Sequence, residues 1–261
     1  MSVSVLRLHR DGLVARVTLD RPAVRNAFNA ELIAALRETF EGLAQDDNVR
    51  VIVLDGAGKT FCGGADVNWM RESLDLSEAD NVRDAEGMSQ MYRAIDRCTK
   101  PVIGRMHGGA LGGGAGLAAV CDIVVSAPDT LFGFTETKLG IIPGVISPFV
   151  LAKIGASHAR ALFLTGERFG AQRALAIGLI HEIVVQAELD GRIAEIVGEF
   201  ASAGPSAVSA AKALIADVRA TDYDATKALT ARAIAKQRTS PEGQEGLRAF
   251  LERRTATWVT E

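Results

Sequence analysis

The sequence predicts an α/β body over residues 1–200 and a helical C-terminal part over residues 201–261. Short apolar runs typical of buried strands recur along the first half of the chain, and glycine-rich loops follow two of them. Stretches with helical spacing separate these runs. From residue 192 onward the apolar spacing is helical and gives no convincing strand, with Gly204-Pro205 as an internal boundary.

The chain begins with a predicted hairpin and a helix. Residues 3–19 contain two alternating apolar runs around Asp11-Gly12, a dipeptide that favours a tight turn between strands. Residues 29–43 then carry apolar side chains at helical spacing, and Asn29 has the side chain of an N-cap.

Two strand–loop–helix units follow and suggest a repeated plan, although no clear sequence repeat is present. The first unit contains a buried strand, a glycine-rich loop and a helix over residues 51–54, 55–66 and 75–98. The second unit contains the same three elements over residues 101–106, 107–114 and 115–121. A further strand and three helical stretches are predicted over residues 123–126, 149–154, 157–164 and 171–177.

Composition narrows the function classes. The 261 residues are 48% hydrophobic and 23% charged, with a net charge of −3. Because no dense block of Lys and Arg is present, we expect no nucleic-acid partner. No apolar run approaches the roughly 20 residues of a membrane span, and the start of the chain lacks a signal core. We therefore expect a cytoplasmic protein with no membrane partner.

Cysteine and histidine offer little chemistry. Cys62, Cys98 and Cys121 have no Cys-x-x-Cys spacing, so reduced thiols are expected rather than disulfides. For Cys62, beside a glycine loop, we expect a packing role. The four histidines are scattered, and we expect no metal site.

The two glycine-rich loops are the main chemical signal. Residues 61–66 read Phe-Cys-Gly-Gly-Ala-Asp, and residues 108–114 read Gly-Gly-Ala-Leu-Gly-Gly-Gly. Each loop follows a predicted strand and precedes a helical pattern, where backbone N–H groups are free to face a ligand. Converging loops would offer two N–H donors to one oxygen, as in an oxyanion hole. The alternative is that the glycines serve only tight turns and close packing.

A dinucleotide site is a competing hypothesis. Residues 114–119 match the loose pattern Gly-x-Gly-x-x-Ala. That pattern lies directly after its strand in dinucleotide-binding proteins, whereas here several residues separate it from Met106, where the predicted strand ends. The sequence therefore disfavours a nicotinamide cofactor.

The chain resembles the crotonase family, which contains enoyl-CoA hydratases and isomerases. The resemblance rests on residues 61–66, 101–103, 110–114, 121–122 and 132–144, and it runs in order from about residue 21 to residue 258. It implies a crotonase-like spiral of ββα units with a helical C-terminal region that builds homotrimers, often paired into homohexamers. It also implies an acyl-CoA substrate, with coenzyme A as part of that substrate and no separate cofactor.

The resemblance implies roles by position. The N–H groups of Ala65 and Gly113 match oxyanion-hole donors, and Glu136 matches the catalytic glutamate. The residues that match regions binding CoA and the acyl group are Arg25, Asn26, Ala27, Asp66, Val67, Trp69, Met70, Gly112 and Gly116. For Asp66 we expect hydrogen bonds to neighbouring N–H groups, and for Trp69 and Met70 either core packing or pocket lining.

One position departs from the pattern of two-glutamate hydratases. Those enzymes have a glutamate two residues after the third glycine of the Gly-Gly-Gly run, where this chain has Gly116. A single glutamate is the pattern of Δ3,Δ2-enoyl-CoA isomerases. Residues 64–70 and 142–149 look instead like bacterial methylglutaconyl-CoA hydratases of leucine breakdown and their isohexenylglutaconyl relatives.

The sequence therefore predicts a hydratase that adds water to a 2-enoyl-CoA thioester with a branched or carboxylated acyl group, as in methylglutaconyl-CoA. An isomerase that uses Glu136 alone is the first alternative. A non-catalytic homologue that binds acyl-CoA is the second.

Overall fold

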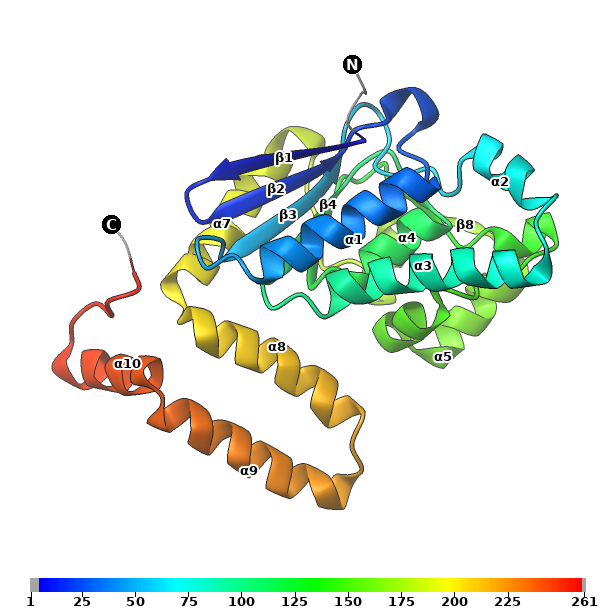
Figure 1. Ribbon diagram of the computed structural model, residues 1–261. Coiled ribbons are helices and arrows are strands. Elements are labelled where there is room, and N and C mark those ends of the chain that lie inside the picture. Colours follow the sequence, from blue (N-terminus) through cyan, green and yellow to red (C-terminus); the bar gives the residue numbers. More distant parts are fainter. Residues whose placement is uncertain (1–4, 260–261) are drawn as a thin grey trace.

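A six-stranded sheet forms the centre of the body (Figure 1). The computed structural model describes residues 5–259, and the strands lie in the order β1, β2, β3, β4, β6, β9. Their bounds are Leu6–Asp11, Val14–Leu19, Val51–Gly56, Val102–Met106, Ile123–Ser126 and Glu182–Ile183. β1 and β2 are antiparallel, which confirms the predicted hairpin, and each later pair of neighbours is parallel. Val3 and Ser4, which that prediction includes, lie outside the described residues.

A three-stranded sheet brings the two glycine-rich loops together. β5 (Gly109–Leu111) lies parallel to β7 (Leu131–Gly133), which is antiparallel to β8 (Arg168–Gly170). Two isolated bridges join the first loop to its surroundings, one between Cys62 and Ala110 and one between Phe28 and Ala65. The first loop therefore runs along the second, as the convergence hypothesis requires.

The helices of the body follow most of the predicted ranges. They are α1 (Ala30–Ala44), α2 (Val67–Ser73), α3 (Glu78–Asp96), α4 (Gly113–Val120), α5 (Ser147–Thr165) and α6 (Ala171–Ala176), with short 3-10 helices η1 (Pro22–Val24), η2 (Glu136–Leu139) and η3 (Gln186–Glu188). Asn29 caps α1, because its side chain accepts a hydrogen bond from Leu32 N at 3.0 Å. The two helical stretches predicted after residue 148 are both part of α5, which is interrupted at Gly155.

The sequence prediction omits α2 and differs from the structure in the second glycine-rich loop and in the short strands. It assigns residues 107–114 to a loop, but β5 occupies part of this range and α4 begins at Gly113. Glycine favours helices poorly, yet residues 114–120 are all buried, and packing outweighs local propensity. The prediction also omits β7, β8 and β9, which have only two or three residues each and so show no periodicity.

Apolar side chains cover both faces of the parallel part of the large sheet. Every residue of β3 is buried, with Ile52 and Leu54 in one apolar cluster and Val51 and Val53 in another. α7 (Leu189–Ser202) packs against the second cluster. Burial on both faces is typical of parallel strands, and it fixes the strand ends from which the loops leave.

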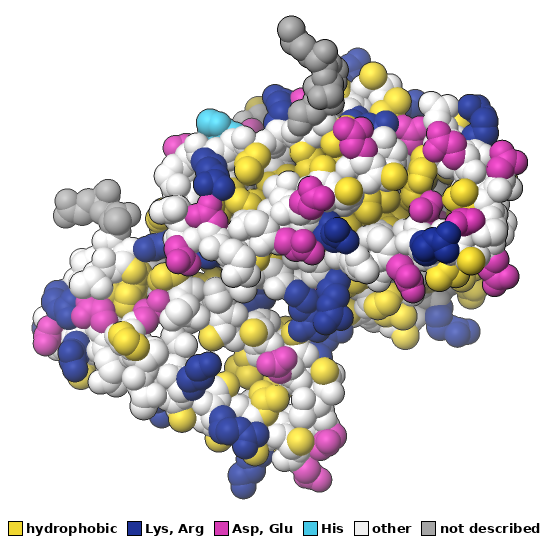
Figure 2. All heavy atoms as spheres, viewed as in Figure 1, with side chains coloured by type: hydrophobic (Ala, Val, Ile, Leu, Met, Phe, Trp, Pro, Cys, Tyr) yellow, Lys and Arg dark blue, Asp and Glu magenta, His cyan; other side chains and the backbone are white. Residues whose placement is uncertain are grey.

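The last three described helices extend away from the body (Figure 1). α8 (Pro205–Arg219), α9 (Tyr223–Thr239) and α10 (Pro241–Glu252) together bury one residue, Ala249. Tyr223 is 90% exposed and Phe250 is 82% exposed, and Figure 2 shows apolar side chains on the surface of this extension. Exposed apolar surface of this kind is typical of a protein contact. Among residues 5–259, no helix is both long and apolar enough to cross a membrane.

Candidate active site

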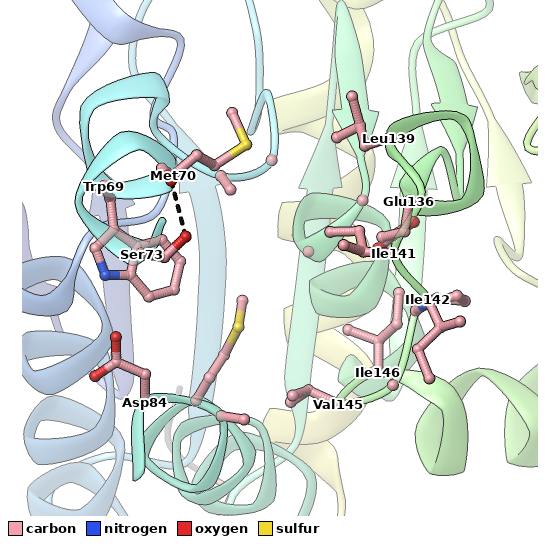
Figure 3. A pocket seen from close by; sticks show the side chains of 18 of the residues that line it. Trp69, Met70, Ser73, Asp84, Glu136, Leu139, Ile141, Ile142, Val145 and Ile146 are labelled. Carbon is pink, nitrogen blue, oxygen red and sulfur yellow. Dashed lines mark hydrogen bonds between the residues drawn. The ribbon is translucent and has the colours of Figure 1, made fainter. Parts of the chain in front are cut away.

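A cavity of about 340 Å³, which we call the acyl cavity, lies between α2, α3 and the segment that follows β7. We call its lining residues Gly63, Gly64, Ala65, Gly112 and Gly113 the glycine wall. The helical wall comprises the lining residues of α2 and α3, which are Trp69, Met70, Ser73, Asn81, Asp84, Ala85 and Met88. The remaining lining residues are Thr135, Glu136, Leu139 and residues 141–146, and Figure 3 shows several of them opposite the helical wall.

Backbone contacts hold the glycine wall in place. Cys62 N donates to Gly109 O at 3.0 Å, and Leu111 N donates to Cys62 O at 3.1 Å. Gly64 has a φ of 99°, and a Cβ built on it would lie only 3.1 Å from Leu111 O. Phe28 N donates to Gly64 O at 2.7 Å on the other side. The two loops therefore approach each other as closely as glycine allows.

Two N–H groups of the glycine wall have no acceptor among the described residues. Gly112 is the N-cap of α4 and Gly113 is its first residue, so the Gly113 N–H has no partner within the helix. Neither this N–H nor that of Ala65 donates a hydrogen bond to any atom of residues 5–259. Both groups are therefore free to bind an acceptor on a ligand in the acyl cavity.

Glu136, the first residue of η2, faces the glycine wall. Its Oε1 lies 3.4 Å from the position that a Cβ on Gly112 would take. Its Oε2 is buried and has no hydrogen-bond partner among the described residues. Burial raises the pKa of this carboxyl above its ordinary value, against a smaller opposing effect of its own backbone N–H. A carboxylate with one unpaired oxygen and a raised pKa is suited to general base catalysis.

Gly116 lies outside the lining of the acyl cavity. A Cβ built on it would lie 2.4 Å from Ile146 Cγ2 and 3.0 Å from Tyr92 Oη. Tyr92 is fully buried and donates a hydrogen bond to Gly113 O at 2.7 Å. The space beside Gly116, where the sequence lacks a second glutamate, is therefore filled by these two side chains. Sequence reasoning did not place either residue beside Gly116, because Tyr92 and Ile146 are each more than twenty residues away in the sequence.

The residues around Arg25 form a turn beneath the first loop. Arg25 and Asn26 have positive φ angles of 56° and 54°. The buried Asn26 side chain donates to Ala57 O at 2.9 Å and accepts from Arg21 N at 2.9 Å, so it ties this turn to the end of β3. Arg25, Asn26 and Ala27 do not line the acyl cavity. Their predicted contact with CoA would therefore lie outside it.

Asp66 caps α2. Its carboxylate accepts a hydrogen bond from Asn68 N at 2.8 Å and pairs with Arg21 at 2.8 Å, which confirms the expected bonds to neighbouring N–H groups. Although burial opposes ionisation, these contacts hold the pKa of Asp66 below its ordinary value. Val67, the first residue of α2, is exposed, and neither residue lines the acyl cavity.

The helical wall contains both predicted and missed residues. Trp69 and Met70 line the acyl cavity, which favours the pocket-lining alternative for both. Ser73 Oγ donates to Met70 O at 2.8 Å in the last turn of α2 (Figure 3). Asp84 was not predicted, because α3 carries many polar residues that are typical of a solvent-facing surface. It is partly buried and makes no hydrogen bond or ion pair with residues 5–259.

Cys62 lies beneath the glycine wall and is fully buried. Burial raises the pKa of its thiol to about 12, so it remains protonated near neutral pH and fits the predicted packing role. In the part of the chain that the structure describes, no group of three or more His, Cys, Asp or Glu side chains is placed to hold a metal ion.

Comparisons with known proteins agree on one family and one fold. The family described as enoyl-CoA hydratase/isomerase matches residues 9–261. A crotonyl-CoA hydratase from Syntrophomonas wolfei is 31% identical over 264 residues, which cover 100% of each chain. A 2,3-dehydroadipyl-CoA hydratase from Escherichia coli is 32% identical over 97% of this chain and 98% of the relative. An enoyl-CoA hydratase structure from Shewanella pealeana is 34% identical, with a TM-score of 0.95 over 98% of this chain and 97% of that one. This likeness confirms the predicted crotonase-like spiral with its helical C-terminal region.

Proposed function

Because this chain belongs to the enoyl-CoA hydratase/isomerase family, we propose that it adds water across the C2–C3 double bond of a 2-enoyl-CoA thioester. One observation carries this proposal. The acyl cavity combines the Glu136 carboxylate, whose Oε2 is unpaired, with the unpaired N–H groups of Ala65 and Gly113. Hydration needs a base for water and donors for the thioester oxygen, and these groups supply both. Coenzyme A enters as part of the substrate, so no separate cofactor takes part.

In the proposed reaction the thioester oxygen accepts hydrogen bonds from Ala65 N and Gly113 N. These donors withdraw electron density and make C3 electrophilic. Glu136 removes a proton from water as the water oxygen bonds to C3, and the electron pair of the double bond moves into a thioester enolate. The two N–H groups stabilise the negative charge that develops on the enolate oxygen. Glu136 then returns the proton to C2, which restores the thioester and the carboxylate.

The single carboxylate beside the glycine wall, that of Glu136, supports a second candidate function. In an isomerase, Glu136 would move a proton between C4 and C2 of a 3-enoyl-CoA, and no water would be added. Ile146 and Tyr92 fill the space beside Gly116, so the cavity gives water one carboxylate anchor rather than two. We prefer hydration because the crotonyl-CoA and 2,3-dehydroadipyl-CoA relatives are named hydratases. A binding role without catalysis would leave the unpaired buried oxygen of Glu136 without a purpose, although such a group is costly to the fold.

Within 2-enoyl-CoA substrates we expect a branched or carboxylated acyl group. Residues 64–70 and 142–149 resemble those of methylglutaconyl-CoA hydratases, and they contribute Trp69, Met70 and residues 142–146 to the acyl cavity. All of these side chains are apolar, and Gly144 contributes only its backbone. Whether the acyl cavity accepts a charged or an uncharged acyl group depends on the side chains of the helical wall.

The proposed assembly is a homotrimer or homohexamer in the cytoplasm, with residues 201–261 as the oligomerisation region. Support comes from the exposed Tyr223 and Phe250 in α9 and α10, and from three buried free thiols that suit a reducing compartment. Light scattering at micromolar concentration tests the assembly. A monomer would contradict it.

The reaction itself is tested by four substrates in isotopically labelled water. They are methylglutaconyl-CoA, a neutral branched 2-enoyl-CoA, crotonyl-CoA and 3-hexenoyl-CoA. A hydratase places labelled oxygen at C3 of a 2-enoyl substrate. Conversion of 3-hexenoyl-CoA to 2-hexenoyl-CoA without labelled oxygen would favour the isomerase instead. Binding of all four without turnover would contradict both enzymatic functions.

A further inference from the structure

We propose that the acyl cavity selects uncharged acyl groups and that Asp84 excludes acyl chains with a distal carboxylate. This inference rests on the proposed function and narrows it. Of the two expected classes, branched or carboxylated, it retains the branched, uncharged one.

The side chains that line the acyl cavity include negative charges but no positive charge. Its ionisable lining residues are Asp84 and Glu136, and the lining contains no Lys, Arg or His. A substrate carboxylate would lose its hydration on entering and would find no cation in return. It would also meet negative charge on both sides of the cavity, and like charges at short range repel most strongly where water is excluded. An apolar acyl chain meets neither cost.

Asp84 is placed to exert this effect on the acyl chain rather than on the reaction. It lies on α3, across the acyl cavity from Glu136 on η2, and its carboxylate is turned away from Glu136, toward Trp69 (Figure 3). A chain whose thioester is held at the glycine wall extends between the helical wall and the apolar side chains of Val145 and Ile146. The Asp84 carboxylate has no ion-pair or hydrogen-bond partner among residues 5–259, so no contact neutralises its charge.

The nearby arginines do not line the acyl cavity. Arg37 and Arg83 line a separate hollow of about 170 Å³, which shares Trp69 and Asp84 with the acyl cavity. Arg37 donates to Gln90 at 2.8 Å, and Arg83 pairs with Asp80. Arg37 Nε has no hydrogen-bond partner among the described residues, but neither arginine lines the acyl cavity or pairs with Asp84, so the acyl cavity keeps its negative lining.

The inference is tested by binding, which does not depend on turnover. The probes are 3-methylglutaryl-CoA and 3,5-dimethylhexanoyl-CoA, saturated compounds in which a carboxylate and an isopropyl group of similar shape occupy the chain end. Calorimetry should show that the native protein binds the neutral compound about tenfold or more tightly. Asp84→Asn should reduce this preference by about tenfold, mainly through tighter binding of the carboxylated compound.

Glu86→Gln is the matched control, because Glu86 is exposed on the same helix and does not line the acyl cavity. It removes the same charge and should leave the preference unchanged. Equal binding of the two compounds by the native protein, or an unchanged preference in Asp84→Asn, would overturn the proposal. So would tighter binding of the carboxylated compound that is lost in Arg37→Met, since the carboxylate would then occupy the neighbouring hollow. Turnover of neutral 2-enoyl-CoA despite any of these results would leave the hydratase function intact, whereas binding of neither compound would overturn both proposals.

Discussion

The glycine wall and the helical wall of the acyl cavity are built in opposite ways. The glycine wall is backbone, fixed by hydrogen bonds between two loops and too crowded for side chains, since a Cβ on Gly113 would lie 2.9 Å from Phe28 and Tyr92. The helical wall consists of side chains on α2 and α3 that are exposed or partly buried, and Asp84 there has no partner among the described residues. Positions that stabilise charge are thus held by the fold, whereas positions that meet the acyl chain are free to vary one at a time.

The largest effect on activity is expected from Glu136→Gln, a substitution beside the glycine wall. The substitution keeps the shape of the side chain and removes the base, so kcat should fall by roughly 10²–10⁴. Binding of acyl-CoA, measured by calorimetry, should stay close to that of the native protein. Glu86→Gln, which changes the same charge outside the acyl cavity, should retain full activity. A loss of less than about tenfold in Glu136→Gln would mean that another group is the base.

A smaller loss is expected within the glycine wall itself. Gly113→Pro removes one N–H donor, and proline is tolerated at the first position of a helix such as α4. Gly113→Ala keeps the donor but adds the Cβ that would contact Phe28 and Tyr92, so it measures the steric cost alone. We expect kcat for the proline variant to lie about 10²–10³ below that for the alanine variant, the usual scale for one oxyanion donor. Equal rates in two folded variants, checked by circular dichroism, would contradict the role of this N–H.

The two walls also differ in how far sequence alone predicts them. Local patterns were sufficient for the β1–β2 hairpin, the Asn29 cap and the buried strand β3, because each depends on residues that are close in sequence. The family resemblance supplied Ala65, Gly113 and Glu136. Asp84 carried no local signal, because a polar residue on a polar helix becomes significant only when the fold places it against a cavity.

The packing around α4 shows the same limit. Tyr92 and Ile146 fill the space beside Gly116, although each is more than twenty residues away in the sequence. The helix itself begins at Gly113, inside a range that glycine content assigns to a loop. Both features follow from contacts made only in the folded chain, which neither propensity nor periodicity describes.

The packing of Tyr92 and Ile146 against Gly116 can be tested by introducing the second glutamate that two-glutamate hydratases have at this position. Gly116→Glu alone should destabilise the protein by about 1–3 kcal/mol, because its Cβ would overlap Ile146. Combining it with Ile146→Ala removes the nearest atom, Cγ2, so the double variant should be more stable than the sum of the single variants by about 0.5–3 kcal/mol. Denaturant unfolding gives this coupling. The double variant should also hydrate crotonyl-CoA faster than Ile146→Ala, and additive losses of stability would show that the two positions do not compete for space.

The smallest expected effect is that of the Glu136 carboxylate on the free energy of unfolding. Burial raises the pKa of Glu136 in the folded protein, so its ionised form disfavours folding. Stability from this group is therefore fully present below the pKa of the unfolded chain, about 4.3, and is lost as pH rises through the higher folded value. Near neutral pH, Glu136→Gln should thus increase the free energy of unfolding by on the order of 1 kcal/mol, and this gain should shrink toward zero near pH 4.

Denaturant unfolding at several pH values measures this difference, with Glu86→Gln expected to stay within about 0.5 kcal/mol of the native protein throughout. A native protein more stable than Glu136→Gln at neutral pH would mean that the carboxylate has a stabilising partner. A native protein less stable than Glu136→Gln would show that the residue expected to contribute most to catalysis also lowers the stability of the fold. This is the expected result, because a carboxylate paired within the fold would be less free to take a proton from water.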